Sequence, residues 1–394
     1  MPPTVETLKA QAVETAQLGD FGDSWFEGPL AAWVYDLQSA VLSEKGRSFF
    51  TRLAVNNLCR RLEVIECLKR NPEIDAVRIP PILYITGLER SGTTFLHNLL
   101  ALHPLGRPLL RWELMFPTPP PVAATYHSDP RIAQMQASIE PLRGSKLEHM
   151  HWVNADEPEE CTWGAFDCTG LLGRAPSALM PTWTRWLQTA DLTPSFLEYR
   201  RLVKLLTWRN PVASGGHLVL KCPQNSRNIA QFADAFPEAR FVFTHRDPYR
   251  AVASGLTLVD HITSAFTEQK DMWRPGGAAV ESVISGAQIA LNAMMTFDAA
   301  STGKCVHVAY PALIKGPANV VVTMYRHFGI DAPEDIGERI ASFVTAQARG
   351  RRAAPPAELP TYGLEQQSLL ARPVFGSYCA RFDVTPETTR LTGA

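Results

Sequence analysis

The spacing of hydrophobic positions changes near Pro80. Over residues 4–70, stretches such as TVETLKAQAVETA and LCRRLEVIECLKRN carry apolar residues at intervals of three and four, which predicts helices. Beyond Pro80, short apolar runs alternate with helix-like segments. These runs predict strands at residues 82–86, 217–221, 240–245 and 305–309.

This alternation predicts an α/β fold: a P-loop-like, three-layer arrangement in which a central parallel sheet lies between helices. Residues 1–79 are then a helical N-terminal extension, and residues 80–394 form the α/β domain. The stretch of about residues 124–210 is rich in Trp, Pro, Met and helix-like pieces, so we expect a helical and loop insertion over the site. We expect the extension and the domain to fold as one compact unit.

The composition is typical of a globular chain: 45% of the 394 residues are hydrophobic. A net charge of −1 disfavours nucleic acid as a partner. The seven cysteines lie scattered without a CxxC pair, which argues against a disulfide framework and a structural zinc site. We find neither an uninterrupted apolar run of about 18 residues nor the apolar core of a signal peptide. We therefore expect a cytoplasmic protein without a membrane span, and an oligomer is possible.

A glycine-containing loop follows the first predicted strand, in YITGLERSGTTFLHNLLALHP at residues 84–104. Backbone amides at the start of a helix can bind an anion, and the hydroxyl groups of Thr93 and Thr94 can donate hydrogen bonds to it. Arg90 adds a charged planar fork that suits phosphate oxygens. The lysine of the triphosphate-binding Gly-Lys-Ser/Thr loop is missing. The loop predicts a phosphate site, and an ordinary strand–turn–helix corner is the alternative.

A second candidate site lies in FVFTHRDPYRAVAS, residues 241–254. Asp247 suits the N-cap of a helix and Pro248 suits its first turn. Arg246 therefore lies where a strand meets a helix, at the sheet edge where α/β proteins bind ligands. Ser254 follows about two helical turns later and could hold a phosphate together with Arg246. Two such sites on different strand ends suit a nucleotide with separated phosphates, not a triphosphate.

Together these motifs resemble those of the sulfotransferases that use 3′-phosphoadenosine 5′-phosphosulfate (PAPS). In that family a [K/R]-S-G-T-T loop binds the 5′-phosphosulfate, and the matching residues here are Arg90, Ser91, Gly92, Thr93 and Thr94. A strand ending in arginine, with a serine eight residues later, binds the 3′-phosphate, and Arg246 and Ser254 have this spacing. The resemblance covers about residues 80–382 and includes a tyrosine–loop–helix stretch at 310–330. With an arginine at the first position of this loop, the chain is more similar to bacterial and tyrosylprotein-type members of the family.

The resemblance implies PAPS as the cofactor and adenosine 3′,5′-bisphosphate as the product. Because a sulfuryl group carries less charge than a phosphoryl group, we expect no metal. Lys221, in HLVLKCPQNS, matches a family lysine that stabilises the transition state, and Arg90 would assist it. Asn225 and Ser226 follow directly and would orient the site.

Transfer also needs a general base for the acceptor hydroxyl. Glu113, in PLLRWELMFP, is the first candidate, because tyrosylprotein-type members place a catalytic glutamate at nearly this spacing after the loop. His151, in EHMHWVNADEPEECTW, is the second, since a neutral histidine is a natural base near pH 7. Glu160 is the third. The same stretch holds three further candidates, His149, Glu157 and Glu159.

Aromatic residues would line an apolar acceptor pocket: Trp25, Phe26, Trp33, Phe116, Trp152, Trp163, Phe166, Trp183, Trp186 and Tyr199. They favour a small hydroxyl acceptor such as a phenol, a hydroxylated lipid or a natural product. Two alternatives stay open. A P-loop kinase or NTPase would need Gly-Lys-Ser/Thr and an acidic strand end for magnesium, and a catalytically inactive relative would only bind the nucleotide.

Overall fold

A parallel sheet lies at the centre of the computed structural model, which describes residues 3–150, 153–301, 303–350 and 362–387. The described residues form one sheet in the order β2-β3-β1-β4-β5, and each neighbouring pair is parallel. The strands are β1 (Ile82–Gly87), β2 (Gly106–Pro108), β3 (His217–Lys221), β4 (Ala239–His245) and β5 (Cys305–Ala309). The predicted α/β fold is confirmed, and β2 is an additional short edge strand.

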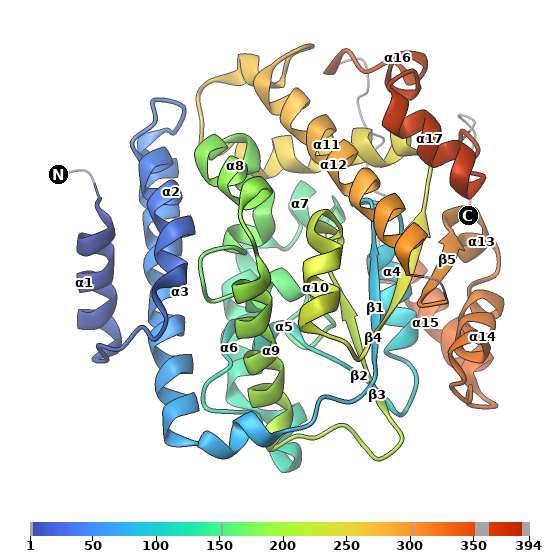
Figure 1. Ribbon diagram of the computed structural model, residues 1–394, viewed down its shortest axis with the longest axis horizontal. Helices are drawn as coiled ribbons and strands as arrows, with labels where there is room; N and C mark the ends of the chain where they lie inside the picture. The colour runs from blue at the N-terminus through green and yellow to red at the C-terminus, as the bar shows by residue number, and fades with distance from the viewer. Residues whose placement is uncertain (1–2, 151–152, 302, 351–361, 388–394) are drawn as a thin grey trace.

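Helices surround this sheet and also extend far to one side of it (Figure 1). Those before the sheet are α1 (Val5–Ala16), α2 (Glu27–Leu37) and α3 (Glu44–Arg70). Those between β1 and β3 are α4 (Thr93–Leu100), α5 (Arg111–Met115), α6 (Pro130–Ile139), α7 (Lys146–Met150), α8 (Pro181–Thr189) and α9 (Thr193–Trp208). Between β3 and β5 lie α10 (Ile229–Ala235), α11 (Pro248–Thr263) and α12 (Ala278–Ala300). After β5 come α13 (Tyr310–Lys315), α14 (Pro317–Phe328), α15 (Ile336–Gly350), α16 (Gln366–Leu370) and α17 (Pro373–Phe382).

The central strands are mostly apolar because both faces of the sheet are covered there. Every residue of β1 is buried, and its side chains alternate between two hydrophobic clusters. Tyr84 packs in the cluster that includes α9 and α10, whereas Leu83 and Ile85 pack in the cluster that includes α4 and α14. This arrangement gives the predicted three layers.

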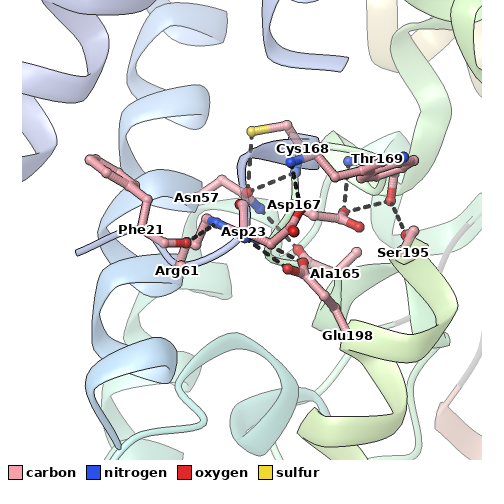
Figure 2. A network of polar contacts seen from close by, with 12 residues as sticks. Phe21, Asp23, Asn57, Arg61, Ala165, Asp167, Cys168, Thr169, Ser195 and Glu198 are labelled. Atoms are coloured by element: carbon pink, nitrogen blue, oxygen red, sulfur yellow. Dashed lines mark hydrogen bonds and ion pairs between the residues drawn. The ribbon is translucent and has the colours of Figure 1, made fainter. Parts of the chain in front are cut away.

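A buried polar network joins the N-terminal helices to the segment before β3, as Figure 2 shows. The guanidinium of Arg61, on α3, is fully buried and pairs with Glu198, on α9, at 2.7 Å. It also donates hydrogen bonds to the carbonyl oxygens of Phe21 and Asp23, both at 2.8 Å. Asn57 donates to the carbonyl of Ala165 at 2.9 Å. The first helices therefore share a core with the rest of the described chain.

No helix within the described ranges is long and apolar enough to cross a membrane.

Candidate active site

The loop after β1 is shaped by a glycine that no other residue could replace without strain. Gly92 has a φ of 91°, and a Cβ added there would lie 2.9 Å from the ring of Tyr310. Its backbone turns the chain into α4, whose first amides, like those at any helix start, have no intrahelical acceptor. Thr93 and Thr94 begin this helix, at the carboxyl edge of the sheet. The local geometry therefore suits an anion.

Ser91 fixes the loop against β4. Its side chain is fully buried, donates to the carbonyl of Leu88 and lies 2.6 Å from the hydroxyl of Thr244, on β4. Its amide also donates to the carbonyl of Leu88, at 3.2 Å. These contacts fix the loop against the neighbouring strand, so the hydroxyl of Ser91 is already engaged within the protein.

The structure brings Arg90, Arg246 and Ser254 together. Arg90 Nε donates to Ser254 Oγ at 3.0 Å, and Arg246 Nη1 donates to the carbonyl of Arg90 at 2.9 Å. Burial, and then the charge of Arg246, lower the pKa of Arg90. Two cationic side chains of this kind, close together and partly shielded from water, favour a bound anion.

Arg246 already has an anionic partner, which sequence reasoning missed. Its Nε and Nη2 donate to the two carboxylate oxygens of Glu387, at 2.7 and 3.0 Å. The amide of Glu387 donates to Asp247 at 2.9 Å. Burial is the largest single influence and opposes the charge of Arg246, but the hydrogen bonds to Glu387 and the nearby acidic groups together outweigh it, so the pKa of Arg246 is raised. The ring of Tyr310 lies 4.1 Å from the guanidinium carbon. This tyrosine begins the tyrosine–loop–helix stretch at 310–330 that the sequence resemblance includes.

Lys221 lies at the end of β3 and joins the loop to one of the candidate bases. Its side chain is 1% exposed. Its Nζ donates to Glu160 Oε1 at 2.6 Å and to Thr94 Oγ1 at 3.2 Å. The predicted transition-state lysine, a loop threonine and a carboxylate are therefore in direct contact.

Glu113, the first candidate base, has a different environment. Its fully buried carboxylate pairs with Arg107 at 2.9 Å, and it accepts hydrogen bonds from the amide of Leu110 at 2.9 Å and the hydroxyl of Tyr126 at 2.6 Å. Burial and the charge of Glu113 raise the pKa of Tyr126 well above its ordinary value. These contacts fix the start of α5 and give Glu113 a structural role. Nothing in them supports the prediction that it is the base.

Two further candidate bases, Glu157 and Glu159, also have partners within the protein. Glu159 pairs with Arg111, and Glu157 accepts a hydrogen bond from Asn154 at 2.8 Å. His151 lies outside the described residues, and the side chain of His149 is not described. Segment 157–160 approaches the start of α5 through an antiparallel bridge between Leu110 and Pro158. This long-range pairing is what brings Glu160 to the sheet edge.

Asn225 and Ser226 shape the turn after β3, and Ser226 also borders the cavity between α11 and α12. Asn225 donates to the hydroxyl of Tyr84 at 3.1 Å, and Ser226 donates to the carbonyl of Pro223 at 2.6 Å. Both side chains are buried. Their contacts support the strand end that carries Lys221.

A cavity of about 90 Å³ opens beside the loop, between α11 and α12. Its described lining is aliphatic, polar and charged, and includes Leu88, Glu89, Gln224, Arg227, Leu258 and Val283. Five of the aromatic residues expected to line an acceptor pocket belong to the main buried core and not to this cavity: Phe26, Trp33, Phe166, Trp183 and Tyr199. Their large apolar area holds the N-terminal helices and the insertion together. The aromatic lining of an acceptor pocket stays a prediction.

Among the described residues, no group of three or more His, Cys, Asp or Glu side chains is arranged to hold a metal ion. The expectation of a metal-free reaction stays a prediction.

Comparison with known proteins identifies solved structures of the same fold. The chain is similar in structure to sulfotransferase STF9 from Mycobacterium avium, with a TM-score of 0.86 and 24% identity over 98% of both chains. It is also similar to sulfotransferase STF1 from Mycobacterium tuberculosis, with a TM-score of 0.81 and 25% identity over 95% of this chain and 99% of that one. No curated protein matches it. The model of the sulfotransferase family matches residues 81–334, and the chain therefore belongs to the sulfotransferase family.

Proposed function

We propose that this sulfotransferase takes its sulfuryl group from PAPS and transfers it to the hydroxyl of a small acceptor. The observation that carries the proposal is the position of Arg246 and Ser254 beside the loop arginine, Arg90. A loop that binds a triphosphate chain needs no second guanidinium at the end of the neighbouring strand. PAPS carries a separate 3′-phosphate, which the guanidinium of Arg246 could bind.

The residues present fit this donor. The amides at the start of α4, the hydroxyls of Thr93 and Thr94, and Lys221 would hold the 5′-phosphosulfate. Arg246 and Ser254 would hold the 3′-phosphate. The carboxylate of Glu387 supports the second assignment, because it is an anion bound by the same fork of Arg246.

PAPS supplies a sulfuryl group on a phosphate leaving group. In the proposed transfer, a bond forms between the acceptor oxygen and sulfur while the bond from sulfur to the phosphate oxygen breaks. Lys221 and Arg90 would neutralise the charge that develops on that leaving oxygen. The proton of the acceptor hydroxyl would pass to a protein base.

Glu160 is the base that we propose, in place of Glu113. Its carboxylate already lies 2.6 Å from Lys221, which in turn contacts the loop. Glu113 could reach an acceptor only by giving up its contacts with Arg107, Leu110 and Tyr126. Since a buried carboxylate without its donors is costly, that movement is unfavourable. His151 stays the second candidate.

The cavity between α11 and α12 is the proposed entry for the acceptor. It borders the loop at Leu88 and Glu89 and the turn after Lys221 at Pro223 and Gln224. Aliphatic side chains of α11 and α12 form much of its wall, so an apolar or aromatic alcohol of modest size suits it.

Calorimetric titration with adenosine 3′,5′-bisphosphate, AMP, ADP and ATP, each with and without magnesium, tests the donor assignment. Magnesium-independent binding that prefers the bisphosphate over AMP would support PAPS and justify an acceptor screen. Preference for ATP with magnesium would contradict the proposal and favour a kinase. Binding of the bisphosphate without turnover of PAPS on any acceptor would favour an inactive relative.

A further inference from the structure

A chain of hydrogen bonds leads from the backbone of Arg246 to the C-terminal helix and back into the sheet. The amide of Arg246 donates to the hydroxyl of Tyr378, on α17, at 3.3 Å. That hydroxyl lies 3.1 Å from Nδ1 of His245, on β4. Nε2 of His245 lies 2.8 Å from Nδ1 of His307, on β5, and Nε2 of His307 lies 3.1 Å from Asp298, on α12.

Only one set of proton positions satisfies every contact in this chain when both histidines are neutral. Asp298 accepts, so His307 carries its proton on Nε2 and accepts at Nδ1. His245 must then donate from Nε2 and accept at Nδ1, where the Tyr378 hydroxyl donates. Burial, and then the neighbouring His307, lower the pKa of His245 to about 3, which keeps this ring neutral. The oxygen of Tyr378 is left to accept from the amide of Arg246.

Helix α17 contacts both ends of this hydrogen-bond chain, through two residues less than one turn apart. Arg381, three residues after Tyr378, donates to Asp298 at 2.7 Å. The ring of Phe382 stacks on His245 and His307, with centroid distances of 4.2 and 5.0 Å. The polar contacts of Tyr378 and Arg381 and the stacking of Phe382 therefore hold α17 in a single position against β4 and β5.

We infer that Tyr378 is a positioning residue for the 3′-phosphate site, which rests on the proposed PAPS function. Arg246 lies at the junction between β4 and α11, where its backbone sets the direction of its guanidinium. Tyr378 fixes the amide of that residue through a hydroxyl whose own direction is set by His245, His307 and Asp298. None of these four side chains belongs to the donor-binding or transfer residues proposed above.

The test compares two nucleotides that differ only in the 3′-phosphate. In Tyr378→Phe we expect the Kd of adenosine 3′,5′-bisphosphate to rise about 3- to 10-fold, the scale of one hydrogen bond. The Kd of AMP should stay unchanged, so the ratio of the two affinities falls. Tyr325→Phe is the matched control, because this buried tyrosine on α14 donates instead to the carbonyl of Leu100, at 3.1 Å. It should leave the ratio unchanged.

A purely structural role for Tyr378 would lower thermal stability while changing both affinities equally or neither, and that result would overturn the inference. If Tyr378→Phe does not fold, Asp298→Ala provides the same comparison, since it removes the acceptor at the other end of the chain. An unchanged ratio in that variant would also overturn it. Wild-type protein that fails to distinguish the two nucleotides would contradict the proposed function itself, and the inference would fall with it.

Discussion

The carboxylate of Glu387 lies in the fork of Arg246, with two contacts of 2.7 and 3.0 Å. If Arg246 binds the 3′-phosphate, the two anions compete for one guanidinium. We expect Glu387→Ala to bind adenosine 3′,5′-bisphosphate roughly tenfold more tightly, as measured by calorimetry, because a charged hydrogen-bonded partner no longer has to be displaced. Glu338→Ala, at an exposed position of α15, is the control. Weaker binding in Glu387→Ala would instead mean that Glu387 orients the fork.

Replacement of Arg246 itself should remove the preference for the 3′-phosphate. A charge-assisted hydrogen bond contributes roughly 1.5–3 kcal/mol. Arg246→Ala should therefore weaken binding of the bisphosphate by about one to two powers of ten while AMP binding changes little. An unchanged affinity for the bisphosphate would contradict the proposal that Arg246 binds the 3′-phosphate. The double variant Arg246→Ala/Glu387→Ala should bind the bisphosphate no better than Arg246→Ala alone. Without the guanidinium of Arg246, the carboxylate of Glu387 has no site at which to compete with the 3′-phosphate.

Loss of charge at Glu160 should lower kcat, whereas loss of charge at Glu113 should lower stability. Glu160→Gln should lower kcat by about 10²- to 10⁴-fold, the typical contribution of a general base. Its affinity for the bisphosphate should change little. The measurement is transfer from PAPS to a phenol chosen by an acceptor screen, with bound nucleotide followed separately by calorimetry.

Glu113→Gln should act on stability instead. It leaves the guanidinium of Arg107 buried without its ionic partner, which typically costs about 3–5 kcal/mol of unfolding free energy. Denaturant unfolding measures this loss, and kcat of the folded protein should remain near the wild-type value. A large fall in kcat with unchanged stability would restore Glu113 as the base.

Three buried histidines should make the fold sensitive to acid. Burial lowers the pKa of His97 and of His245 to about 3, and that of His217 to about 4, from 6.5. Below pH 6.5 the unfolded chain binds protons that the folded chain does not, so the free energy of unfolding falls as the pH falls from 6.5 towards about 3. Each histidine contributes a slope of up to about 1.4 kcal/mol per pH unit. Urea titrations between pH 7 and pH 4 measure it.

His97→Gln should reduce this slope, because the amide can still donate to the carbonyl of Val219 but does not titrate. The exposed His261→Gln is the control and should leave the slope unchanged. An equal slope in wild type and His97→Gln would contradict the lowered pKa of His97 in the folded protein.

Local patterns identified the sheet and the loop at 90–94 from the sequence. The four predicted strands are rich in apolar residues, which is typical of a sheet covered on both faces. β2 was missed because Gly106–Pro108 has three residues and no apolar pattern. The loop at 90–94 and the pair of Arg246 and Ser254 could be found because each motif lies within one strand–helix junction.

Contacts between distant segments could not be found in this way. Glu160 reaches Lys221 across 61 positions, through the bridge of Leu110 with Pro158. Glu387 reaches Arg246 across 141 positions. Residue type and spacing ranked Glu113 first and Glu160 third among the candidate bases, and only the tertiary partners of each carboxylate favour the opposite order.

The pairing of Arg61 with Glu198 bears on how this protein could be recombined with its relatives (Figure 2). The helix that carries Arg61 precedes the sheet, and the helix that carries Glu198 belongs to the segment inserted between β1 and β3. Exchanging either segment alone for one without the partner residue would leave a buried ion without its counterpart. A functional chimaera would therefore have to keep an arginine and a glutamate at both of these positions.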